Sequence, residues 1–302
     1  MNDIGGSLRF PASANGAVTL KSGLGRVSAF NPSQKAERGL LAQSMSVQGL
    51  IVRTAADLQL SMPALIATDP RDPFHVPLPW QGAPLKSPIR VAVARDDFGF
   101  GMHPDVATAI DKAASALSDA GYALEVVEPP LARETGEVGY RVLMGEVKEL
   151  LYPDIRTYGS SELNRIFDEY FLAFPPYEGA ELLTMMAQRT HYARAWSLFF
   201  EEYPLVLTPF MLKPFFSPGR DAEGPEGVSD ALVGAHWSFI MNFLGLPAGN
   251  LPTHIANLPN GPIPIGVQIA GRRWREDLVV EAMQAIETVI PPTCETLWNR
   301  HT

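Results

Sequence analysis

The chain has one cysteine and no surplus of basic residues. Its 302 residues contain 24 Lys and Arg against 33 Asp and Glu, which gives a formal net charge of −9 at pH 7. One cysteine excludes an internal disulfide, and this usage predicts a cytoplasmic protein. The acidic balance argues against nucleic acid and anionic membrane surfaces, because both bind clustered Lys and Arg. A small molecule or another protein is the expected partner.

Long apolar runs are also missing, because charged residues or prolines interrupt every hydrophobic stretch. The sequence therefore predicts no membrane span. A His-Glu-x-x-His pair and a Gly-Lys-Ser/Thr phosphate loop are both absent, so neither a metal nor another cofactor is predicted. The serine-hydrolase patterns Gly-x-Ser-x-Gly and Ser-x-x-Lys do not occur either. What the chain does have is 46% hydrophobic residues, enough for a sizeable core.

Helical and strand patterns alternate along the chain, which predicts an α/β fold. The segment 103–130 predicts a helix, a stop at Gly121 and a strand, and with the apolar strand before it this makes one βαβ unit. Two long helices are expected to cover a sheet face. Strands are otherwise predicted over 16–27, 89–97, 204–211 and 261–271, and helices over 53–67, 135–151, 181–203, 236–252 and 275–290.

The stretch "DIGGSLR" near the start carries the most chemistry. Adjacent glycines adopt positive φ readily, so the N–H groups of Ile4, Gly5, Gly6 and Ser7 could converge on one point and form an oxyanion hole. The Ser7 hydroxyl would then stand within reach of the same acyl carbon. On local pattern alone, a simple Gly-Gly turn is the alternative interpretation.

The longer run "DIGGSLRFPASANGAVTLKSGLGRV" resembles the centre of the amidase signature family of serine hydrolases. Three later segments, "SVQGLIVRTAADLQLSMPALIATDPRDP", "FLGLPAGNLP" and "PIPIGVQIAGRRWREDLVV", are similar to further motifs of that family, with Leu50 in the place of its usual proline. Together these segments extend the resemblance over essentially the whole chain.

The resemblance implies an α/β domain with a mixed, largely parallel sheet sandwiched between helices. It also implies amide hydrolysis through an acyl-serine, with Ser7 as nucleophile and the N–H groups of Ile4, Gly5, Gly6 and Ser7 as the oxyanion hole. In the family, a lysine and a second serine upstream activate the nucleophile, and neither has a counterpart here. We therefore expect residues 1–302 to form a single amidase-like domain that is incomplete at its N-terminus.

No other residue is predicted to replace the missing base, because the sequence around each candidate favours a structural role. Lys21 falls on a strand, where an ordinary lysine is expected to face solvent. None of the six histidines, His75, His103, His191, His236, His254 and His301, has a catalytic signature. His103 precedes Pro104 at a predicted helix start, which favours a cap or surface role.

Asp3 and Arg9 are predicted to pair, either pinning the loop or binding a substrate carboxylate, and loop pinning is favoured. Arg53 and Asp57 are expected to form a local ion pair without chemistry. Gln268 would line the pocket or satisfy a neighbouring backbone group.

Two functions remain open from the sequence. The first is an amidase acting on a small-molecule amide substrate, weak or inactive as this chain. The second is a non-catalytic, amidase-like binding or interaction module. In either case a missing segment would leave an unpaired strand edge and apolar surface, which predicts a homo-oligomer or a complementing N-terminal chain.

Overall fold

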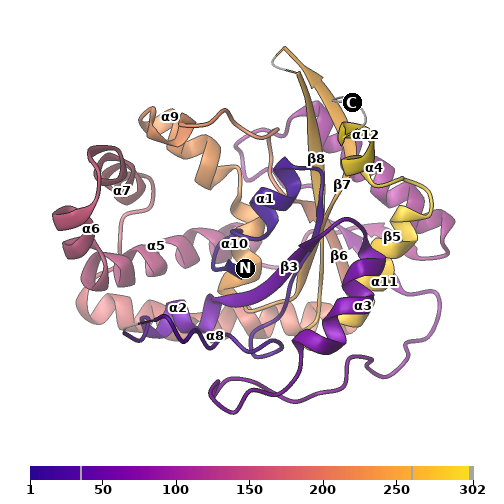
Figure 1. The fold of residues 1–302 in the computed structure, drawn as a ribbon, viewed down its shortest axis with the longest axis horizontal. Helices are drawn as coiled ribbons and strands as arrows, with labels where there is room; N and C mark the ends of the chain where they lie inside the picture. The colour runs from indigo at the N-terminus through magenta and orange to yellow at the C-terminus, as the bar shows by residue number, and fades with distance from the viewer. Residues whose placement is uncertain (35, 260, 299–302) are drawn as a thin grey trace.

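The computed structural model describes residues 1–34, 36–259 and 261–298. Within them, eight strands form one mixed sheet in the order β1-β3-β2-β7-β8-β6-β4-β5 (Figure 1). The strands are β1 Asn2–Asp3, β2 Val18–Lys21, β3 Val47–Val52, β4 Arg90–Val93, β5 Ala123–Val126, β6 Leu205–Pro209, β7 Ala248–Leu258 and β8 Gly261–Gly271.

Helices flank the sheet on both sides. They are α1 Arg9–Ala14, α2 Leu40–Met45, α3 Ala55–Leu65, α4 Pro104–Asp119, α5 Ala132–Leu150, α6 Tyr152–Tyr158, α7 Ser161–Ala173, α8 Gly179–Glu202, α9 Pro225–Val228, α10 His236–Phe243, α11 Glu276–Glu287 and α12 Thr293–Trp298, with a 3₁₀ turn η1 Arg220–Ala222 and a π turn η2 Ser229–Val233. In the described part of the chain, no helix is both long and apolar enough to cross a bilayer.

The α/β class and the mixed sheet are confirmed, but the expected parallel majority is wrong. Among the described strands, only β4 with β5 and β4 with β6 pair in parallel, and the predicted βαβ unit is β4-α4-β5. The five other pairings are antiparallel. The longest of them joins β7 to β8, which follow each other across a short turn, and strands joined in this way must run antiparallel.

The predicted helix over 236–252 is also wrong in its second half. Helix α10 ends at Phe243, and β7 begins at Ala248. Gly245 has a φ of +68°, the left-handed conformation that commonly ends a helix. The Leu246 N–H closes the turn on the Met241 carbonyl, 2.9 Å away. The helix is therefore terminated by a glycine cap. The apolar pattern continues past this point, and for that reason the predicted helix was too long.

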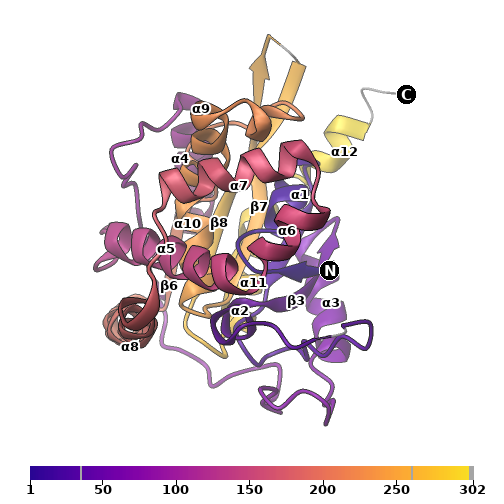
Figure 2. The same ribbon diagram turned by 90° about the vertical axis from the view of Figure 1, so that its left-hand side faces the viewer.

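Two apolar cores lie on the two faces of the sheet. One is built with α3, α4 and α11, and the other with α5, α8 and α10 (Figure 1). Ala92 and Val206 of the sheet share the second core with Trp196 of α8, so the two long predicted helices do cover this face. Figure 2 shows α6 and α7 outside that layer, and neither helix contains a buried residue.

Candidate active site

Strand β1 leads into a tight loop, residues 4–8, that ends at the start of α1; we call it the Gly-Gly-Ser loop. Gly6 has a φ of +134°, which L side chains rarely adopt. A Cβ at Gly6 would lie 2.3 Å from the Phe10 ring and 2.7 Å from Ser238 Oγ. The loop therefore needs glycine at this position for both its conformation and its space.

The Asp3 carboxylate binds this loop from the interior of the protein. It is fully buried, and it accepts hydrogen bonds from the Gly6 N–H at 2.8 Å and the Leu8 N–H at 3.1 Å. Burial alone would raise the pKa of Asp3, but the Arg9 guanidinium and these donors hold it below the usual value. Asp3 is thus an anion that fixes the path of the loop.

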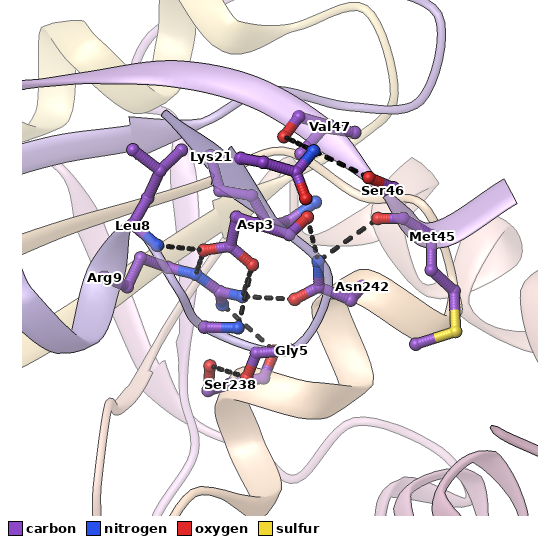
Figure 3. A network of polar contacts seen from close by, with 12 residues as sticks. Asp3, Gly5, Leu8, Arg9, Lys21, Met45, Ser46, Val47, Ser238 and Asn242 are labelled. Carbon is purple, nitrogen blue, oxygen red and sulfur yellow. Dashed lines mark hydrogen bonds and ion pairs between the residues drawn. The ribbon is translucent and has the colours of Figure 1, made fainter. Parts of the chain in front are cut away.

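Arg9 is equally buried and pairs with both Asp3 oxygens, through Nε and Nη2, at 3.1 Å each. Its Nη1 donates to Gln268 Oε1 at 2.6 Å and to the Ser238 carbonyl at 3.0 Å. Its Nη2 also donates to Asn242 Oδ1. All of these acceptors belong to the protein itself. The contacts of Arg9 are therefore those expected if it pins the loop, the first of its two predicted roles, rather than if it binds a substrate carboxylate (Figure 3).

The outer members of this network come from distant parts of the chain. Gln268 on β8 donates to Thr208 Oγ1 at 3.1 Å and to the Trp237 carbonyl at 3.2 Å. Asn242 on α10 donates to the carbonyls of Asp3 and Met45. Sequence reasoning weighed Gln268, which does satisfy a backbone group, but missed Asn242. No local motif marks Asn242, because its role depends on packing between residues more than 190 positions apart.

Ser7 lies on the open side of the same loop. Its side chain is exposed, and within the described residues it has no hydrogen-bond partner. The N–H groups of Ile4, Gly5 and Ser7 are likewise unbonded in the described part of the chain. The Gly6 N–H, predicted as a further donor to the oxyanion hole, is already bonded to Asp3. Three N–H groups beside one exposed hydroxyl therefore remain available to a ligand.

The prediction that Lys21 faces solvent is wrong. Lys21 lies on β2, between β3 and β7, and is fully buried rather than solvent-facing, with Arg9, Asp3 and Glu276 close enough to affect its charge. Its Nζ donates to the Ser22 carbonyl at 3.1 Å. Burial, with the nearby Arg9 charge, lowers the pKa of Lys21 to about 7, while Asp3 and Glu276 act in the opposite direction.

A second buried ion pair, Arg26 with Glu276, also lies within electrostatic range of Lys21. Arg26 Nε stands 3.3 Å from Glu276 Oε2, and Glu276 Oε1 accepts from the Gly23 N–H at 2.9 Å. The Arg26 amino groups bind the carbonyls of the segment 78–80. Despite this pairing, burial raises the pKa of Glu276.

No described histidine hydrogen-bonds to Ser7. His103 caps α4 as predicted, accepting from the Asp105 N–H at 3.2 Å. His254 Nε2 lies 2.9 Å from Asp105 Oδ1. His236 is buried, and this burial lowers its pKa to about 4. The remaining described histidines are His75 and His191, and His301 lies outside the described residues.

The expected Arg53–Asp57 ion pair is wrong. Asp57 instead accepts from the Thr54 N–H at 3.0 Å and completes a capping box at the start of α3. A carboxylate at this position of a helix start readily accepts a hydrogen bond from the backbone N–H of the N-cap residue, and Asp57 makes this bond instead of pairing with Arg53. Among the described residues, no group of three His, Cys, Asp or Glu side chains could hold a metal ion.

Comparisons with known proteins agree with this architecture. The family model described as Amidase matches residues 2–280. Indoleacetamide hydrolase of Bradyrhizobium diazoefficiens is 36% identical over 299 residues, which cover 99% of this chain but 56% of that protein. A glutamyl-tRNA(Gln) amidotransferase subunit from Moorella thermoacetica is 29% identical over 318 residues, covering 95% and 62%. The chain thus spans a little over half the length of these relatives.

One solved structure extends the comparison to the fold. The structure of 6-aminohexanoate cyclic dimer hydrolase complexed with substrate superposes with a TM-score of 0.74 at 21% identity. The match covers 97% of this chain and 66% of the other.

Proposed function

Because the chain belongs to the amidase family, we propose that it takes part in hydrolysis of a carbon–nitrogen amide bond, with Ser7 as the nucleophile. One observation carries the assignment of Ser7. Its exposed hydroxyl stands on a loop whose Ile4, Gly5 and Ser7 N–H groups are unbonded in the described residues, while Asp3 fixes the loop from inside. A preset loop of this kind is what stabilisation of an oxyanion requires.

In the proposed reaction, Ser7 Oγ bonds to the amide carbon as its proton passes to a base. The carbonyl π electron pair moves to the oxygen, and the Ile4, Gly5 and Ser7 N–H groups donate hydrogen bonds to the oxyanion that forms. Collapse of this intermediate breaks the carbon–nitrogen bond, and the amine leaves with the proton. Water then adds to the acyl carbon, releases the acid and returns a proton to Ser7. Each oxyanion donor is typically worth about 3 kcal/mol of the barrier.

The described residues supply no base in contact with Ser7. Lys21 has a lowered pKa, but it is buried and donates to Ser22. We therefore propose that the serine reacts slowly in this chain alone and that a second polypeptide contributes the base. A non-catalytic binding module is the second candidate, and the same lack of a base favours it.

The substrate proposal follows the relative with 36% identity, whose name specifies an indoleacetamide. An arylacetamide is thus the first substrate to test. The amidotransferase relative acts on a tRNA-linked group by its name, but a net charge of −9 disfavours a tRNA partner here.

The test is the rate of covalent labelling by a fluorophosphonate, measured by intact mass and peptide mapping from pH 6.5 to 9. We expect labelling at Ser7 alone, rising about tenfold per pH unit, because hydroxide must then remove the proton. Ser7→Ala should abolish it, and Ser33→Ala, at another exposed serine, should not. A plateau near pH 7 would show that the chain has its own base. Absence of labelling at every pH would favour the binding module.

A further inference from the structure

Helix α10 presents two polar side chains to the Gly-Gly-Ser loop, Ser238 and Asn242. They are four residues apart, so they lie on one face of the helix, and both are fully buried. The Ser238 hydroxyl donates to the Gly5 carbonyl at 3.0 Å (Figure 3). The Asn242 amide donates to the Asp3 carbonyl at 3.1 Å. The helix therefore holds the loop at two of its carbonyl groups.

A hydrogen bond to a carbonyl also sets the direction of the next N–H group. The peptide bonds of this loop are trans, so each C=O points away from the N–H of the following residue. The Asp3 carbonyl is held by α10, and the Ile4 N–H therefore points away from that helix. The Gly6 carbonyl accepts from the Phe10 N–H at 2.7 Å, which directs the Ser7 N–H away from α1. Two of the three proposed oxyanion donors are thus oriented by a bond to their own peptide group.

The third donor, the Gly5 N–H, lacks such a bond. In the Ile4–Gly5 peptide, neither the carbonyl nor the N–H has a hydrogen-bond partner among the described residues. Its direction is limited by the next peptide, Gly5–Gly6, because the two peptides share the Gly5 Cα. That peptide is bound at both ends. Its carbonyl accepts from Ser238, and its N–H donates to Asp3 Oδ1 at 2.8 Å.

The glycines of the loop make the contact with Ser238 important. Both torsion angles beside the Gly5–Gly6 peptide belong to glycines, whose backbones adopt the widest range of conformations. A Cβ at Gly6 would lie 2.7 Å from Ser238 Oγ, so the hydroxyl approaches the loop closely because this residue is glycine. The same lack of a side chain would let the peptide rotate if the bond from Ser238 were removed.

The hydroxyl of Ser238 does not serve its own helix. A serine within a helix often donates to a carbonyl of the preceding turn. Ser238 donates instead to a residue 233 positions away in the sequence. The bond therefore fixes the loop against α10 and contributes nothing to the helix itself.

We propose that Ser238 is a positioning residue for the reaction at Ser7. Its hydroxyl fixes the Gly5–Gly6 peptide, and this peptide keeps the Gly5 N–H directed at the oxygen on which charge develops. Because Ser238 is fully buried, it acts through the loop and not on the substrate. This inference rests on the proposed function, in which Ser7 is the nucleophile.

The first measurement is residue-resolved amide hydrogen exchange in Ser238→Ala, which removes the hydroxyl and keeps the helix. We expect exchange at Gly6 to become about tenfold faster, because its N–H loses Asp3 when the peptide rotates. Exchange at Leu8 should stay slow, since Asp3 Oδ2 still accepts from that N–H. Unchanged protection of Gly6 in the variant overturns the proposal.

The second measurement is the rate of Ser7 labelling by the fluorophosphonate, as a function of reagent concentration. Ser238→Ala should lower the maximal rate about tenfold and leave the half-saturating concentration unchanged, because the Gly5 N–H acts on the transition state. Ser238→Thr keeps a hydroxyl and should restore the wild-type rate. If Ser238→Thr labels as slowly as Ser238→Ala, the hydroxyl is not the group that acts, and the proposal is overturned.

Thr253→Val is the matched control. Thr253 is buried, and its hydroxyl donates to the Ala109 carbonyl at 2.8 Å, so valine removes the same kind of bond far from the loop in the sequence. Urea unfolding should show similar losses of stability in Thr253→Val and Ser238→Ala. Only Ser238→Ala should slow the labelling of Ser7. Equal slowing in both variants would identify a general effect of destabilisation and would overturn the proposal.

The two readouts also separate this proposal from the proposed function. Faster exchange at Gly6 in Ser238→Ala, with no labelling of Ser7 in the wild type, would show that Ser238 holds the loop and would remove the proposed function. Wild-type labelling and unchanged Gly6 exchange in Ser238→Ala would remove the role of Ser238 and leave the proposed function standing.

Discussion

Two fully buried ion pairs in this molecule have opposite effects on their carboxylates. The Asp3–Arg9 pair holds the pKa of Asp3 below its usual value, whereas the pKa of Glu276 is raised despite its pairing with Arg26. Both acids are fully buried, and burial raises the pKa of each. The difference between them lies in the donors that replace water.

Asp3 receives two loop N–H groups and two guanidinium contacts, so both of its oxygens are satisfied. Glu276 Oε2 has only the Arg26 contact at 3.3 Å and no hydrogen bond within the described residues. The comparison teaches that a buried charge is stabilised by the number and geometry of its donors rather than by the presence of an opposite charge.

The largest effect is expected from neutralising the two acids in turn. Asp3→Asn should lower the free energy of unfolding by about 3 kcal/mol, because it leaves Arg9 buried without its counter-ion. Glu276→Gln should lower it by about 1 kcal/mol, because Arg26 keeps its three carbonyl acceptors in the segment 78–80 and burial already favours the neutral form of residue 276. Urea denaturation of both variants measures the difference. Equal losses would show that the two sites are equivalent.

The second prediction concerns Lys21, which both pairs influence. Its pKa is about 7 in the folded chain and 10.5 as the ordinary value, so from pH 7 to 9 the unfolded chain keeps a proton that the folded chain has lost. Stability should therefore rise with pH in this window, by about 1.4 kcal/mol per unit for one proton. The slope should disappear in Lys21→Met. An unchanged slope in the variant would place the titrating group elsewhere.

The third prediction tests the outer shell of the first pair. Gln268→Leu removes an acceptor of Arg9 Nη1 and a partner of Thr208, so we expect a loss of about 2 kcal/mol. Gln59→Leu is the matched control, because Gln59 accepts one partly buried hydrogen bond from Trp80. Its loss should stay below about 1 kcal/mol. Thermal and urea unfolding of the two variants would refute the account if their order were reversed.

The smallest effect is expected at an exposed ion pair. Arg90 binds Glu125 and Glu202, and all three side chains are at least 40% exposed. Solvent screening limits such pairs, so Arg90→Met should change the free energy of unfolding less than any of the other variants. Raising the salt concentration should reduce even this difference. A loss comparable to that of Asp3→Asn would mean that burial does not govern these pairs.

The parts that could be predicted from sequence are local. The Gly-Gly turn, the Asp3–Arg9 pairing and the cap at His103 each involve residues within six positions of one another. Helix periodicity likewise located α5 and α8.

The parts that failed depend on distant packing. Lys21 is buried beside groups that lie far away in the sequence, among them Glu276, more than 250 residues later. Asn242 joins the loop network only because α10 lies next to β1, where the Asn242 amide donates to the Asp3 carbonyl. The prediction of a largely parallel sheet was wrong, because the antiparallel pairing of β7 with β8 cannot be derived from the apolar pattern of either strand alone.

The most direct test of the central claim is residue-resolved amide hydrogen exchange in the Gly-Gly-Ser loop of the unliganded chain. We predict slow exchange at Gly6 and Leu8, whose N–H groups are held by buried Asp3, and fast exchange at Ile4, Gly5 and Ser7. Equal protection at Gly5, Ser7 and Gly6 would contradict the account, because no N–H group would then be free to receive an oxyanion.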